Sequence, residues 1–184
     1  MYLLKFSVIV LVLVQLLTNC SSVKPNDPGG EEVSTESTVM MSSEAKAADA
    51  RFNSVLEAID KKDAEAIKAM FSERALADDP DLDASIDYLF NLFDGAVVSW
   101  ERDKISYDDT SSKRGVSEMT HSWYTVYTET GSYRFLLLEY TKNTIERDMK
   151  GLYTLHAIDD ADENASWGAW QRLKAPGVYM PPQE

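Results

Sequence analysis

Two histidines and three tyrosines are the side chains of this sequence best suited to hold a ligand or move a proton. They are His121, His156, Tyr88, Tyr124 and Tyr140. Histidine titrates near physiological pH, so either imidazole could act as a general base or a ligand. The alternative, which is the commoner role, is a histidine packed within a β-strand beside a hydrogen-bond partner. No motif joins these residues, so we predict no catalytic residue and keep all five as candidate pocket-lining residues.

Groups that could bind a metal are scattered along the chain. A zinc site would need both histidines and a carboxylate to converge without the short spacing of a zinc motif. The acidic runs at 78–83 and 159–163 lack the central glycine and terminal glutamate of a calcium loop, and we interpret them as solvated charge. The tryptophans are more typical of core packing than of a ligand cone. The sequence therefore predicts neither a metal site nor a cofactor.

The single cysteine, Cys20, follows an apolar run from Phe6 to Leu17, and Lys5 is the only charge before it. The run holds about a dozen residues, which is typical of a signal peptide and shorter than the roughly 20 residues of a membrane-spanning helix. A lone cysteine forms no internal disulfide, so the fold must depend on packing. We predict a signal peptide over residues 1–19, with a short membrane anchor as the alternative.

The stretch Leu17-Thr18-Asn19-Cys20 resembles the lipobox of bacterial lipoproteins, with Asn19 where that motif usually has Gly, Ala or Ser. The resemblance implies cleavage before Cys20 and a diacylglyceryl group on its sulfur. Two acyl chains form a stable membrane anchor. We therefore expect a lipoprotein of the bacterial cell membrane, with its domain on the extracytoplasmic side.

Composition divides the remaining chain into a linker and one domain. Residues 20–44 are rich in Ser, Thr, Glu, Pro and Gly and predict a flexible stalk, whereas residues 45–184 predict a single domain. The formal net charge of -13 argues against nucleic acid as a partner, because no basic surface would neutralise its phosphates. We expect any small-molecule ligand or protein partner to be neutral, cationic or apolar.

The spacing of apolar residues predicts helices first and strands afterwards. Helices are expected over 49–63, 64–77 and 81–93, the second of them capped by Asp63. From residue 96 the period changes to two, which predicts strands within 96–109, 119–141 and 151–158. A short turn is expected inside the first range, and a turn at 129–132 divides the second. This order predicts an α+β fold, with N-terminal helices packed on one face of an antiparallel sheet.

The helices around KKDAEAIKAMFS and the meander that follows are similar to the nuclear-transport-factor-2-like, or cystatin-like, fold. In that fold helices cover a curved, cone-shaped sheet. The segments SIDYLFNLFDGAVVSW, HSWYTVY, GLYTLHAI and WQRLKAPGVYMP resemble a family of uncharacterised bacterial lipoproteins over Arg51–Pro181. The resemblance implies the curved sheet and brings no known activity with it.

Three expectations about function remain open from the sequence. We expect a lipid-anchored cell-surface domain that binds a small molecule or a protein partner without catalysis. The alternative is an enzyme of isomerase or dehydratase type, acting on a small apolar substrate in the cone. Pairing of two copies through the exposed sheet face, giving a homodimer, is a third expectation.

Overall fold

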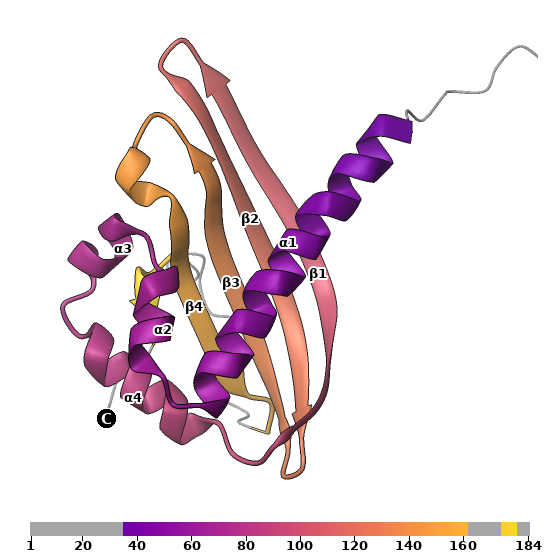
Figure 1. The fold of residues 1–184 in the computed structure, drawn as a ribbon, viewed down its shortest axis with the longest axis vertical. Coiled ribbons are helices and arrows are strands. Elements are labelled where there is room, and N and C mark those ends of the chain that lie inside the picture. Colours follow the sequence, from indigo (N-terminus) through magenta and orange to yellow (C-terminus); the bar gives the residue numbers. More distant parts are fainter. Residues whose placement is uncertain (1–34, 162–173, 180–184) are drawn as a thin grey trace, which may run out of the picture. The chain divides into compact units, whose positions relative to one another are not determined.

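Helices precede strands in the order that the sequence predicts (Figure 1). The computed structural model describes residues 35–161 and 174–179, which belong to the second of two units, Thr35–Glu184. The signal peptide predicted over 1–19 and Cys20 lie outside the described residues. The helices are α1 (Thr35–Asp60), α2 (Ala64–Met70), α3 (Glu73–Asp78) and α4 (Leu82–Leu92). Within the described ranges, no helix is long and apolar enough to cross a membrane.

The first helix is longer than the sequence predicts. It begins at Thr35, so residues 35–44, which the sequence analysis assigns to the stalk, are helical. Ala45, Lys46, Ala47 and Ala48 are strong helix formers that carry the helix back from the predicted start at residue 49. Helical spacing of apolar residues is weak in this stretch, which is why a search for periodicity misses it.

The predicted helix over 64–77 is two helices, because Phe71 and Ser72 are extended. Asp63 caps α2 as predicted, accepting a hydrogen bond from the Ala66 N–H. Ser72 caps α3 in the same way, since its hydroxyl accepts from the Ala75 N–H at 3.1 Å. Serine is favoured at a helix start over a helix interior, so Ser72 stabilises the start of α3.

The strands form one five-stranded sheet in the order β1-β2-β3-β4-β5. Their bounds are β1 (Val97–Ser112), β2 (Gly115–Thr128), β3 (Ser132–Asn143), β4 (Gly151–Asp159) and β5 (Gly177–Val178), with a short 3-10 helix, η1 (Arg147–Met149), before β4. The first four strands are an antiparallel meander, and β5 pairs parallel with β4. The sheet is therefore mixed, which corrects the purely antiparallel prediction, while the α+β class with a curved sheet is confirmed (Figure 1).

The short turn predicted inside 96–109 is wrong. β1 runs without interruption, and its pairing with β2 shifts register between Arg102 and Lys104. An extra residue in one strand of an antiparallel pair breaks the alternation of side chains without ending the strand. A short turn would interrupt the alternation in the same way, so the two are alike in sequence.

Aromatic rings fill the space between α1 and the sheet, which α1 crosses diagonally (Figure 1). Phe52 of α1 stacks on Tyr124 of β2 with ring centroids 3.8 Å apart. Trp100 and Phe135 each meet Phe52 edge-on, with centroids 5.4 Å away. Burying a side chain of this kind stabilises a fold by roughly 1.5–3 kcal/mol, so this cluster is a main attachment of α1.

Candidate functional site

The five residues singled out from the sequence are spread over both faces of the sheet and α4. His121 and Tyr124 lie three positions apart on β2, so their side chains point to opposite faces. Tyr124 faces α1, and its hydroxyl donates to Asp49 Oδ1 at 3.4 Å. Burial raises the pKa of Tyr124 to about 12. Its stacked position beneath Phe52 makes Tyr124 a core residue.

His121 is buried on the other face, with 2% of its surface exposed. Its Nε2 lies 3.2 Å from Asp108 Oδ2 on β1, and its ring stacks beside that of Trp123. Burial lowers the pKa of His121 from its ordinary value, against the opposing effect of Asp108. The neutral imidazole is therefore the favoured form in the folded protein.

The other three candidates have separate surroundings. His156 on β4 is 1% exposed, and its ring centroid lies 4.2 Å from that of Tyr179. Tyr140 meets Tyr153 edge-on at 6.1 Å, and burial raises the pKa of both phenols. Tyr88 is half-buried on α4. None of the five lines the groove described next.

A groove of about 590 Å³ lies between α1 and strands β2 and β3. Its volume falls in the range typical of small-molecule sites. Polar side chains and small alanines line it, namely Ser43, Glu44, Ala47, Ala48, Ala50, Arg51, Ser54, Glu118, Thr120, Ser122, Glu139 and Thr141. We call this space the α1 groove.

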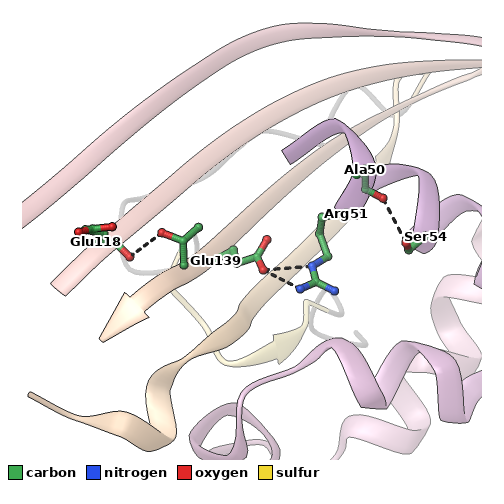
Figure 2. A network of polar contacts seen from close by, with 6 residues as sticks. Ala50, Arg51, Ser54, Glu118 and Glu139 are labelled. Atoms are coloured by element: carbon green, nitrogen blue, oxygen red, sulfur yellow. Dashed lines mark hydrogen bonds and ion pairs between the residues drawn. The ribbon is translucent and has the colours of Figure 1, made fainter. Parts of the chain in front are cut away.

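An ion pair spans the α1 groove from helix to sheet, as Figure 2 shows. Arg51 of α1 donates to Glu139 Oε1 of β3 from Nε at 3.1 Å and from Nη2 at 2.7 Å. The side chains of Arg51 and Glu139 are 32% and 17% exposed, so solvent screens the pair only in part. The contact fixes the guanidinium against one wall of the groove.

The sheet wall carries a second carboxylate beside Glu139. Glu118 of β2 pairs with Lys142 of β3 at 3.1 Å, and both are exposed over about half of their side chains (52% and 43% for Lys142 and Glu118). The hydroxyl of Thr141 donates to the backbone oxygen of Glu118 at 3.3 Å (Figure 2). These contacts tie together β2 and β3 where they border the groove.

Two hydroxyl-bearing residues lie deeper on β2. Thr120 and Ser122 are 6% and 3% exposed and line the α1 groove next to Glu118 along the same face. Buried hydroxyls are normally hydrogen-bonded, and each can both donate and accept. They give this wall two further groups that could contact a polar ligand.

A second ion pair holds α1 from its other side. Arg102 of β1 pairs with Asp49 and also donates to the Ala45 backbone oxygen at 3.1 Å. The hydrogen bond to Asp49 raises the pKa of Arg102. Since Asp49 and Arg51 reach β1 and β3 respectively, α1 is attached to strands on both sides of β2.

This arrangement suits binding through hydrogen bonds and charge. The lining includes carboxylates, hydroxyls and one guanidinium, which can donate and accept hydrogen bonds and bear both signs of charge. Across residues 35–161 and 174–179, no group of three or more His, Cys, Asp or Glu is arranged to hold a metal ion.

The α1 groove is not evident from the sequence alone, although β2 carries a partial signal of it. Glu118, Thr120 and Ser122 alternate along the same face as Tyr124 and Val126. The face therefore changes from polar to apolar along a single strand. A polar half on an otherwise core-facing strand indicates that this part of the strand does not contribute to the apolar core.

Comparison with protein families gives one finding. A family model described as "Domain of unknown function (DUF5104)" matches residues 54–160. The matched span runs from the second half of α1 to the end of β4, and includes Glu118 and Glu139 but neither Glu44 nor Arg51. No curated protein matches the chain.

Proposed function

This chain belongs to the DUF5104 family. We propose that it is a lipid-anchored binding domain that holds a small polar molecule in the α1 groove. The family description names no activity, so the proposal depends on the residues of this chain. Its domain would stand on the extracytoplasmic side of a bacterial membrane. Anchor and groove are supported by different observations and are tested separately.

The lipid anchor is supported by the residues that precede the folded domain in the chain. Cys20 follows the apolar run Phe6–Leu17, and Leu17-Thr18-Asn19-Cys20 resembles a lipobox. A diacylated cysteine would keep the protein on the membrane without a spanning helix.

Binding is supported above all by the ion pair of Arg51 and Glu139 inside a groove of about 590 Å³. A charged pair held at the wall of a hollow supplies oriented donors and acceptors for a polar molecule. The aromatic cluster around Phe52 fills the adjoining space between helix and sheet, so an apolar substrate would find no room there. Both histidines lie outside the groove, which favours binding over the alternative of an isomerase or dehydratase.

Replacing Cys20 tests the anchor. Cys20→Ser removes the sulfur that would carry the lipid, so the variant should leave the membrane fraction and take up no labelled fatty acid. The unchanged protein should take up the label and stay in that fraction. Equal membrane retention of both proteins would reject the lipid anchor and favour an uncleaved apolar segment.

Filling the groove tests binding. Ala47 lies on the exposed side of α1 and lines the groove, so Ala47→Trp should fill it without disturbing the core. Ala69→Trp, at an exposed position of α2 that does not line the groove, is the matched control. Native mass spectrometry should detect a small molecule on the wild type and on the control, and none on Ala47→Trp. Identical small molecules on all three proteins would contradict the proposed groove.

A further inference from the structure

The charges around the α1 groove indicate which kind of molecule it would accept. Building on the proposed function, we infer that its ligand carries a protonated amino group together with several hydroxyl groups. The inference rests on two observations that are independent of each other. One is the excess of negative charge in the lining, and the other is a pair of buried hydroxyl-bearing residues, Thr120 and Ser122, that line the groove.

The charge excess follows from the ion pairs. Three glutamates and one arginine line the groove, and Arg51 is already engaged by Glu139 through two donors. Lys142 offsets Glu118, but Glu44 makes no ion pair with any residue in the described part of the chain. An ammonium group near Glu44 would gain attraction there, with a smaller contribution from Glu118 because Lys142 already neutralises it, whereas a carboxylate or phosphate near Glu44 would be repelled.

The hydroxyls supply the second observation. Thr120 is 6% exposed and lines the groove. Its side chain forms no hydrogen bond with the residues described here. A threonine hydroxyl has one donor and two acceptor sites that a ligand in the groove can use in place of water. Ser122 adds a second buried hydroxyl on β2. The exposed residues Ser54 and Thr141 also line the groove, and their hydroxyls already donate to the Ala50 and Glu118 backbone oxygens. A ligand with several hydroxyls of its own would match them.

The apolar part of the lining limits the shape of the ligand. Ala47, Ala48 and Ala50 of α1 offer small methyl groups, and no aromatic ring lines the groove. Such a wall allows close approach of carbon-bound hydrogens but gives no stacking platform. An amino sugar combines an ammonium group, hydroxyls and a carbon ring within a volume of this size.

Three sugars that differ in charge provide the test. Glucosamine, glucose and glucuronate share one ring and are cationic, neutral and anionic at about pH 7, below the usual pKa of an amine. Equilibrium titration of the full-length protein in detergent should give glucosamine at least about tenfold tighter binding than glucose, and glucuronate the weakest. Glu44→Gln should weaken glucosamine binding by about threefold or more, Glu118→Gln should weaken it less, and both should change glucose binding by a smaller factor than glucosamine binding.

Glu57→Gln is the matched control, because Glu57 lies on α1 outside the groove and its replacement removes the same charge. It should leave all three affinities unchanged. Equal affinity for glucose and glucosamine, tighter binding of glucuronate, or no binding of any of the three would overturn the inference. The proposed function would survive these results if Ala47→Trp still abolished the native small molecule, so the two failures are distinguishable.

Discussion

At the scale of single residues, burial acts on His121 and Tyr124 in opposite directions. It raises the pKa of Tyr124 to about 12 and lowers the pKa of His121. Removing a group from water disfavours its charged form, which is the anion of tyrosine and the cation of histidine. Both side chains of β2 are therefore held neutral, one on each face of the sheet.

The lowered pKa of His121 predicts a loss of stability in mild acid. Below the ordinary histidine pKa of 6.5 the unfolded chain binds a proton that the folded chain resists, so the free energy of unfolding falls as the pH falls. Urea denaturation at about pH 7.5 and about pH 5.5 should show this fall, on the order of 1 kcal/mol, in the wild type.

His121→Gln removes the titrating group and is the comparison for that measurement. The variant should lose less stability between the two pH values, whatever packing it loses at both. Equal losses in the two proteins would show that His121 does not titrate differently on unfolding. In that case the attraction of Asp108, 3.2 Å from Nε2, would offset the effect of burial on the protonated imidazole.

At the scale of elements, the junction of α3 and β4 depends on close backbone approach. The Ser72 N–H donates to the Leu152 oxygen at 2.8 Å, and Gly151 directly precedes that residue. Gly151 has φ +127, and a Cβ there would lie 3.0 Å from the Ser72 nitrogen. A side chain at this position would strain its own backbone and separate the helix from the strand.

Gly151→Ala should therefore destabilise the protein by about 1–3 kcal/mol in a denaturant titration. Gly131→Ala is the matched control, because nothing lies within 4 Å of a Cβ placed there. That substitution should change the free energy of unfolding by no more than about 0.5 kcal/mol. Similar losses from both variants would mean that the α3–β4 junction does not depend on Gly151.

Most elements could be predicted from sequence, because their residues repeat a local pattern. The turn before Ser132, the strand Gly151–Asp159 and the helix Leu82–Leu92 all follow from spacing within a few residues. The register shift in β1 between Arg102 and Lys104 could not, because a bulge and a turn break alternation alike. The split between α2 and α3 depends on Ser72 reaching β4, which is a contact across the fold.

The α1 groove could not be predicted for the same physical reason. Arg51 and Glu139 are 88 positions apart, and only the packing of α1 across β2 brings them together. His121 and His156 have side chains suited to a functional site, but both are buried within the sheet. Residue type indicates the chemistry that a side chain can perform, whereas the position of the groove depends on how α1 packs on the sheet.

At the scale of the whole molecule, the folded domain should be separable from the residues before it. Ala48 is the first buried side chain along the described part of α1, and the core cluster begins at Phe52. We predict that a fragment starting at Glu44 folds alone, with the same stability as one starting at Thr35 to within about 1 kcal/mol. Circular dichroism during heating measures the unfolding of both fragments. Absence of a cooperative transition in the shorter fragment would refute the prediction.

The meander also has a consequence for how fast the chain can fold. Each of the strands β1 to β4 pairs with its neighbour in sequence, so these contacts close short loops. The attachment of α1 closes much longer ones, since Phe52 and Tyr124 are far apart in the chain and Arg51 contacts Glu139 across 88 positions. Long loops form late because their closure costs more entropy before any contact is gained. The hairpins should therefore be present in the folding transition state, and the docking of α1, which forms the groove, should come after it.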